Sequence, residues 1–220
     1  MPKIKSRPKA VIFDMDGVLI DSMPYHFIAW YEALRPYGVR VSCFDVYSKE
    51  GEKWNRTLKD LFVRSGIKPS PKLLNKVFVS RQKIFKKFFK RYIFSGAQGL
   101  LSFLSKRGYS LGLVTGTPRN EIDTILTRKI ISKFRVIVAG DQIRRGKPHP
   151  DPYLKAARLF GLKPQECLVV ENAPLGIRAA KKAGMFCVAI TTSLPKEYLK
   201  EADLAIDKLG DIQNLLSRCI

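Results

Sequence analysis

The chain has 220 residues, of which 45% are hydrophobic, and no apolar run approaches the ~20 residues that span a bilayer. We therefore expect a folded cytoplasmic protein without a membrane partner. Its cysteines are scattered without metal-finger spacing and its histidines are few, which indicates reduced thiols and excludes a site rich in these ligands: Cys43, Cys167, Cys187, Cys219, His26 and His149. The formal net charge of +21 attracts anions, but the lysines are spread along the chain without a basic–aromatic motif, so we expect no nucleic-acid partner.

The first predicted strand covers residues 10–13, which are continuously apolar, as expected for a strand buried on both faces. Asp14, Asp16 and Gly17 follow it directly. Two carboxylates so close together repel each other and resist burial unless a cation or protons compensate their charge. The segment predicts a metal-assisted site at the carboxyl end of the strand, with an ordinary Asp/Gly turn as the alternative.

Residues 22–93 have a different character. Apolar side chains recur at helical spacing over residues 25–34, 55–63 and 71–88, the last after a Ser70-Pro71 helix start. Residues 49–92 hold 14 Lys/Arg against 3 Asp/Glu. We therefore predict a basic helical insertion.

Strand and helix patterns alternate after Gly96. Strands are expected at 109–114, 135–139, 166–170, 186–190 and 202–206, and helices at 99–107, 119–131, 152–160, 175–183, 195–200 and 212–217. This pattern predicts an α/β fold, a Rossmann-like doubly wound parallel sheet that binds ligands at the carboxyl ends of its strands. We predict a core of residues 1–21 and 94–220, with residues 22–93 as an inserted α-helical cap subdomain over those ends.

Polar residues follow the second predicted strand, where Thr115 and Gly116 lead into Thr117-Pro118 and a helix beginning near Arg119. Hydroxyls and backbone N–H groups at a helix start suit phosphate oxygens. A plain helix cap is the alternative interpretation.

Two further strand ends carry charged residues. Lys147 stands among three prolines in a polar loop, where a fixed cation would stabilise phosphoryl oxygens and keep a carboxylate ionised; a surface lysine is the alternative. Glu171 is a hard oxygen ligand of the kind that Mg²⁺ takes, and Asn172 offers another oxygen or holds the first in place.

Together these motifs resemble the haloacid dehalogenase superfamily, in its phosphatase and phosphomutase branch with a helical cap. The resemblance covers nearly the whole chain and rests on DMDGV (14–18), KP (147–148) and ENAPLG (171–176). It implies that Asp14 is the nucleophile and accepts phosphate as an aspartyl ester, while Asp16 is the general acid and base. It further implies that Thr115 and Lys147 bind the phosphoryl group, and that Mg²⁺ sits on Asp14, the carbonyl of Asp16 and Glu171. The branch usually has a second acid at the position of Asn172, so Asn172 is expected to supply an oxygen directly or through water.

The cap residues separate two activities. The segment around His26 is similar to the start of the cap in β-phosphoglucomutases, and His26 is expected to bond Asp16 or a substrate hydroxyl, with a partly exposed helix histidine as the alternative. Trp54 occupies the arginine position of the mutase Gly-x-x-Arg signature, and Pro118 and Arg119 replace the mutase pair after the second motif.

With Trp54 in the arginine position, the chain lacks a phosphate anchor that a mutase needs. We therefore predict a Mg²⁺-dependent phosphatase acting on a small phosphorylated metabolite, a sugar phosphate or similar organophosphate. We expect Lys53, Trp54 and Arg119 to complete the substrate-binding residues, and Lys49 or Arg56 to attract anionic substrates at the entrance. A β-phosphoglucomutase-like phosphomutase is the first alternative. A basic nucleic-acid-binding protein on the same fold is the alternative from another class.

Overall fold

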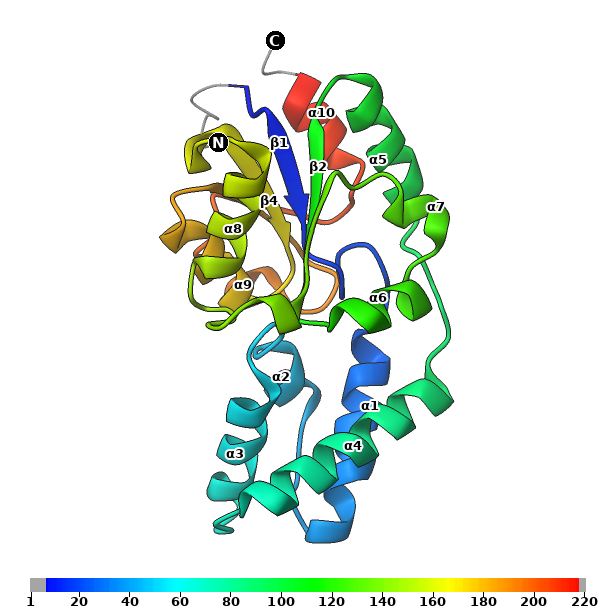
Figure 1. Ribbon diagram of the computed structural model, residues 1–220, viewed down its shortest axis with the longest axis vertical. Helices are drawn as coiled ribbons and strands as arrows, with labels where there is room; N and C mark the ends of the chain where they lie inside the picture. Colours follow the sequence, from blue (N-terminus) through cyan, green and yellow to red (C-terminus); the bar gives the residue numbers. More distant parts are fainter. Residues whose placement is uncertain (1–6, 218–220) are drawn as a thin grey trace.

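The computed structural model describes residues 7–217 of the chain (Figure 1). The ends of the predicted core region, residues 1–6 and 218–220, lie outside the described residues, as does Cys219. Cys43, Cys167 and Cys187 are free thiols. Within the described part of the chain, no helix is long and apolar enough to cross a membrane.

Six parallel strands form the central sheet in the order β3-β2-β1-β4-β5-β6. Their bounds are β1 (Ala10–Phe13), β2 (Ser110–Val114), β3 (Val136–Val138), β4 (Cys167–Glu171), β5 (Phe186–Ile190) and β6 (Leu204–Ile206). Phe13 lies level with Leu113 on one side and Val170 on the other, so β1, β2 and β4 end at the same edge. The predicted Rossmann-like doubly wound sheet is confirmed, and the segments after these strands must meet at one place.

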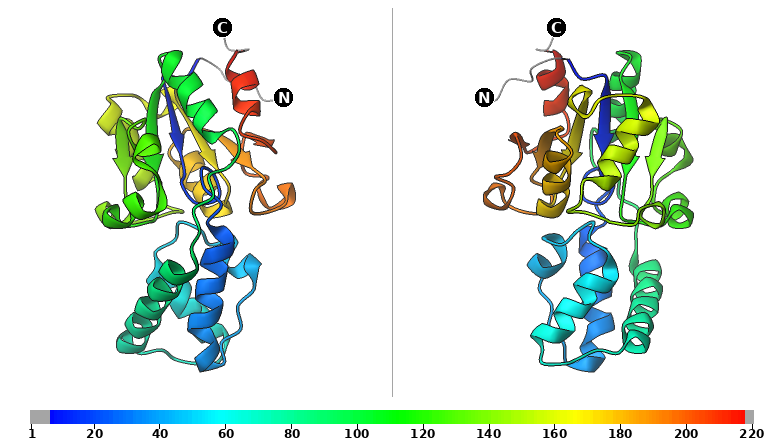
Figure 2. Two further views of the ribbon diagram at one scale, coloured as in Figure 1. Left: turned by 90° about the vertical axis from the view of Figure 1, so that its right-hand side faces the viewer. Right: turned by 60° about the vertical axis from the view of Figure 1, so that its left-hand side comes forward.

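Helices cover both faces of the sheet (Figures 1 and 2). One layer consists of α5 (Ala97–Lys106), α6 (Arg119–Ile125), α7 (Arg128–Ile131) and α10 (Asp211–Ser217). The other consists of α8 (Asp151–Phe160) and α9 (Pro174–Lys182). Short 3₁₀ turns occur at η1 (Arg35–Tyr37), η2 (Gly140–Gln142), η3 (Pro164–Glu166) and η4 (Lys196–Tyr198).

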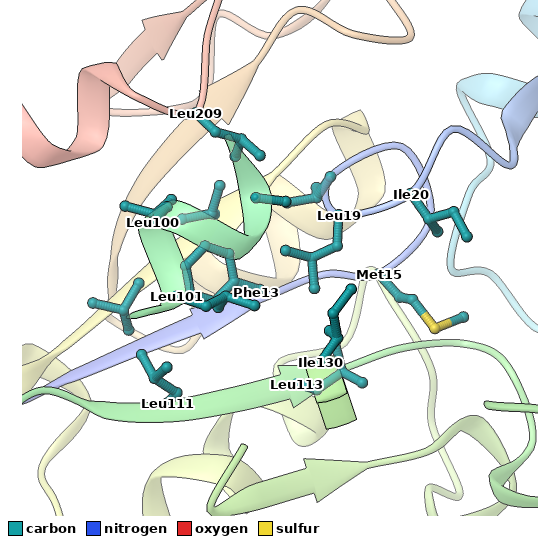
Figure 3. Close-up of a cluster of buried hydrophobic side chains, with 14 of the residues drawn as sticks. Phe13, Met15, Leu19, Ile20, Leu100, Leu101, Leu111, Leu113, Ile130 and Leu209 are labelled. Atoms are coloured by element: carbon teal, nitrogen blue, oxygen red, sulfur yellow. The ribbon is translucent and has the colours of Figure 1, made fainter. Parts of the chain in front are cut away.

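The larger core cluster continues past the end of β1 (Figure 3). Phe13 packs with Leu100 and Leu113, and the following Met15 and Leu19 are equally free of solvent contact. In a strand, residues two apart face the same side. Met15 keeps this relation to Phe13 beyond the end of β1, and both are buried in the same cluster. This burial anchors the loop that carries Asp14 and Asp16.

The cap is a separate helical layer over the carboxyl ends of the strands (Figures 1 and 2). It contains α1 (Met23–Leu34), α2 (Cys43–Tyr47), α3 (Trp54–Arg64) and α4 (Pro71–Phe88). Its own apolar cluster includes Trp30, Leu34, Leu58, Phe62 and Val77. As expected from Ser70-Pro71, the Ser70 hydroxyl accepts a hydrogen bond from Leu73 N at 3.2 Å and caps α4.

Two crossings join the cap to the core, and they lie side by side. Asp21 N donates to Tyr92 O at 2.9 Å, and Phe94 N donates to Leu19 O at 3.1 Å. These paired crossings support the cap boundaries after residues 21 and 93, which remain a prediction.

The secondary structure departs from the expected pattern at three places. The helix expected over 119–131 is divided into α6 and α7, because the Arg91 guanidinium donates to Thr124 O and Ile125 O, the carbonyls that would continue the helix. Only the 3₁₀ turn η4 forms within 195–200. Helix α2 had no sequence prediction; its start is a capping box in which Ser42 and Asp45 bond each other's backbone N–H.

Candidate active site

A buried ion triad forms where β1 and β4 end. Lys147 Nζ lies 2.6 Å from Asp14 Oδ1 and 2.5 Å from Glu171 Oε1, and all three side chains are at most 3% exposed. Burial tends to lower the pKa of Lys147, but the charges of Asp14 and Glu171 raise it above its ordinary value. Burial raises the pKa of Asp14 well above its ordinary value, and the Lys147 charge opposes this rise. Lys147 is thus a fixed cation beside the predicted nucleophile.

Glu171 has hydrogen-bond donors on both of its carboxylate oxygens. Lys147 and the Tyr153 hydroxyl, at 2.6 Å, donate to Oε1, while the backbone N–H groups of Asn172 and Ala173 donate to Oε2 at 3.0 and 3.4 Å. These contacts make Glu171 the partner that orients Lys147. Tyr153 was missed at the sequence level, since a tyrosine on the apolar face of a helix carries no signal of its own.

Asp16 accepts hydrogen bonds on both oxygens. Ser22 Oγ and His26 Nε2 lie 2.6 and 3.0 Å from Oδ1, and the hydroxyls of Thr117 and Thr115 lie 3.3 and 3.5 Å from Oδ2. Burial raises the pKa of Asp16, but the interactions with His26 and Ser22 outweigh it and leave this pKa lowered. The arrangement therefore stabilises the Asp16 carboxylate.

His26 connects the cap to Asp16. An Arg81 N–H bonds His26 Nδ1, and because arginine can only donate, Nδ1 must be the acceptor. The ring proton is then on Nε2, which donates to Asp16. His26 also stacks on Phe85 with ring centroids 4.6 Å apart. Of the two interpretations of His26, the contact with Asp16 is the one present.

The loop after β2 lies at the mouth of the site. Thr115 is buried and accepts from Thr117 N at 3.1 Å, and Gly116 is exposed beside the cap residue Gly51. Arg119 does not join them. Its side chain is exposed, its backbone N–H bonds Asp141, and it is absent from the pocket lining, so its substrate-binding role stays a prediction that this geometry does not support.

A cavity of about 270 Å³ separates the cap from these strand ends. The predicted cap residues Lys53 and Trp54 line it. Lys53 Nζ, however, donates to Gly140 O at 2.9 Å across the domain boundary, and Trp54 stacks on Phe78 at 4.0 Å. The expected entrance cations are also engaged, as Lys49 pairs with Asp60 at 2.8 Å and Arg56 with Glu52 at 3.2 Å. These contacts count against their predicted attraction for an anionic substrate.

The cavity also contains Glu50 and Arg81, which sequence reasoning missed. A weak signal for Arg81 existed, since it is the single arginine of the lysine-rich helix α4. Glu50 offered a similar signal as one of the few acids in a basic cap.

Gly51 brings the cap against the core at Lys147. Its backbone has φ +80°, and a Cβ there would overlap the Lys147 methylene groups. We expect Gly51→Ala to lower kcat/KM by about 10- to 100-fold, because either the cap or Lys147 must shift. Gly66→Ala is the matched control, as Gly66 has φ +75° in the same cap with nothing within 4 Å. Equal losses of activity in both variants would contradict this close-approach role.

Two oxygen atoms at the site have no hydrogen-bond partner within residues 7–217. These are Asp14 Oδ2 and Asn172 Oδ1, both buried. Asn172 Nδ2 donates to Ser193 Oγ at 2.8 Å, which fixes the amide. No group of three or more His, Cys, Asp and Glu side chains in the described residues is arranged to hold a metal. The two free oxygens are nevertheless hard donors that suit Mg²⁺.

Comparison with known proteins decides the family. The family model for haloacid dehalogenase-like hydrolases matches residues 11–190. The chain belongs to this family. The haloacid dehalogenase-like hydrolase described here is 31% identical over 206 residues to validoxylamine A 7'-phosphate phosphatase of Streptomyces hygroscopicus subsp. limoneus, covering 93% of this chain and 96% of that protein. It is also 31% identical over 218 residues to the phosphorylated carbohydrates phosphatase of Thermotoga maritima, covering 96% and 100%.

A solved structure from Bacteroides vulgatus, described only as a candidate beta-phosphoglucomutase, matches this hydrolase with a TM-score of 0.88. The two are 31% identical, with 98% of this chain and 91% of that chain covered. The predictions of the family, of the fold and of a phosphoric monoester hydrolase are confirmed.

Proposed function

We propose that this hydrolase is a Mg²⁺-dependent phosphatase that cleaves a small phosphorylated metabolite, a sugar phosphate or similar organophosphate, through an aspartyl-phosphate on Asp14. The observation that carries the proposal is the pairing of two unequal acids. Asp14 is held by the buried Lys147 and keeps one oxygen free, whereas Asp16 is surrounded by hydroxyl and imidazole donors. Two carboxyl groups in different environments suit different roles, one as nucleophile and one as acid and base.

In the first step the Asp14 carboxylate attacks phosphorus and the bond to the substrate alcohol breaks. Protonated Asp16 gives its proton to the leaving oxygen, and Lys147 stabilises the charge on the phosphoryl oxygens. In the second step water attacks the aspartyl-phosphate, Asp16 takes the water proton, and inorganic phosphate leaves with Asp14 restored.

The hydroxyl groups beside Asp16 can hydrogen-bond both its ionised and its protonated form. Hydrogen bonds from Ser22 and His26 favour the carboxylate, which is the form that activates water. The Thr115 and Thr117 hydroxyls at Oδ2 can rotate to accept a hydrogen bond from the protonated form, since a hydroxyl both donates and accepts.

The proposed Mg²⁺ ligands are Asp14, the carbonyl of Asp16 and Asn172. Their fit rests on the unpartnered buried oxygens of Asp14 and Asn172, while Glu171 has donors on both oxygens and serves Lys147. When bound, the cation would neutralise phosphoryl charge so that an anionic carboxylate can approach.

Asn172→Asp is expected to tighten Mg²⁺ binding by roughly 10-fold or more, because a carboxylate adds one negative charge to a hard-oxygen site. Isothermal titration of the purified protein with MgCl₂ measures this directly. Asn214→Asp, on the last helix, is the control for the added charge. Absence of Mg²⁺ binding by the native protein, together with activity that survives chelation, would contradict the metal assignment.

A phosphatase is favoured over a phosphomutase, because a mutase must also hold the second phosphate of a sugar bisphosphate. Lys49, Lys53 and Arg56 are each bound to a protein oxygen, and Trp54 stacks within the cap. The decisive experiment measures phosphate release from a panel of phosphometabolites with Mg²⁺, with isomerisation of glucose 1-phosphate assayed in parallel. Isomerisation faster than phosphate release would favour the mutase. Salt-sensitive nucleic-acid binding that is indifferent to Asp14→Asn, without phosphate release, would favour the third alternative.

A further inference from the structure

Two charged cap side chains face the cavity with hydrogen-bonding capacity to spare. The Nε of Arg81 is buried and has no partner, although another N–H of the same guanidinium holds His26. Within residues 7–217, no hydrogen bond or ion pair engages the Glu50 carboxylate, which is half-buried in the cavity lining. Glu50 and Arg81 line the same cavity.

Glu50 is also close to the reacting groups. It lines the same cavity as Lys147 and directly precedes Gly51, which lies against the Lys147 side chain. A substrate whose phosphate is bound by Lys147 therefore has its alcohol portion in the cavity that Glu50 and Lys147 both line.

The other basic side chains near this part of the cavity already bind protein oxygens. Lys53 donates to Gly140 O, Lys49 pairs with Asp60, and Arg56 pairs with Glu52, which also accepts from Thr57 at 2.7 Å. Gln82, next to Arg81 on α4, donates to Glu121 at 2.8 Å. A second phosphate in the cavity would meet the free Glu50 carboxylate with Arg81 as the one compensating charge among these groups.

Part of the cavity wall is aromatic. Trp54 stacks on Phe78 with an interplanar angle of 11°, and Trp30 and Phe85 lie under the Arg81 guanidinium at 5.3 and 5.2 Å. The indole rings of Trp30 and Trp54, which line the cavity, can pack against the C–H faces of a sugar or polyol. The volume of about 270 Å³ suits a single small ligand.

We propose that Glu50 is a specificity-determining residue that binds hydroxyl groups of the substrate's alcohol portion and selects sugar or polyol monophosphates against bisphosphates. The proposal rests on the phosphatase function proposed above. A hydroxyl both donates and accepts, so a pair of neighbouring hydroxyls can donate to Glu50 and accept from Arg81 Nε at the same time. A second phosphate only accepts and carries negative charge, so Glu50 repels it.

The test compares kcat/KM for glucose 6-phosphate, sorbitol 6-phosphate and glucose 1,6-bisphosphate, with p-nitrophenyl phosphate as a substrate that lacks hydroxyls. Native protein, Glu50→Gln, Glu50→Ala and Glu50→Lys are measured with Mg²⁺. Glu32→Gln is the matched control, because Glu32 lies in the same cap, pairs with Arg35 and does not line the cavity. Thermal melting of each variant checks folding.

We expect native protein and Glu32→Gln to prefer the monophosphates over the bisphosphate by at least about 10-fold. Glu50→Gln should reduce this preference, Glu50→Lys should reverse it, and Glu50→Ala should lower activity on the two hydroxylated monophosphates more than on p-nitrophenyl phosphate. Phosphate release with the same substrate ratios in native protein and Glu50 variants would overturn this inference alone. No phosphate release from any substrate by the native protein would overturn the proposed function and the inference with it.

Discussion

Replacement of Asp14 by asparagine is expected to abolish phosphate release, with kcat lower by roughly 10⁴-fold or more. The amide keeps the shape of the side chain but cannot attack phosphorus, and no other carboxylate is in place to do so. Asp16 is held by Ser22 and His26, and Glu171 has donors on both oxygens. The measurement is phosphate release under single-turnover conditions with Mg²⁺, using whichever phosphometabolite the native protein cleaves best.

Asp123→Asn is the control for this experiment, because Asp123 is an exposed acid on α6, outside the cavity lining. It should retain native activity. Trapping of phosphate on Asp14 in a form that hydroxylamine releases is expected, since an aspartyl-phosphate is a reactive acyl phosphate, whereas activity of Asp14→Asn within about 10-fold of native would count against covalent catalysis.

Replacement of Lys147 by methionine should reduce both activity and stability. Methionine fills a similar volume but leaves Asp14 and Glu171 as two buried carboxylates without their cation. Removing one partner of a buried ion pair typically costs about 3–5 kcal/mol in the free energy of unfolding. We expect a loss of that order in urea unfolding, and a fall in kcat of roughly 10³-fold because phosphoryl charge is no longer stabilised.

Lys200→Met is the matched control, since Lys200 is an exposed lysine of the core. It should change the free energy of unfolding by less than about 0.5 kcal/mol. A Lys147→Met protein as stable as this control would show that the triad makes no net contribution to stability. Full activity in the same variant would remove Lys147 from the mechanism.

Local sequence was sufficient to predict features that depend only on residues neighbouring in the chain. Asp14 and Asp16 follow a four-residue apolar strand, and Ser70-Pro71 begins α4 as expected. The helix expected over 119–131 shows the opposite case, because its interruption comes from Arg91, far away along the chain. A periodic pattern cannot register a distant donor that captures helix carbonyls.

The sequence by itself determined the parallel α/β core, the basic helical cap and the strand-end residues Asp14, Asp16, Thr115, Lys147 and Glu171. It could do so because parallel strands bring their carboxyl ends to one edge whatever the details of packing. Only the tertiary structure decided which side chains those residues bond and which residues line the cavity. It joined Tyr153 and Lys147 to Glu171, connected Arg81 through His26 to Asp16, placed Glu50 in the cavity and left Arg119 outside it. These contacts join segments far apart in sequence, and their distances depend on how the cap packs against the sheet.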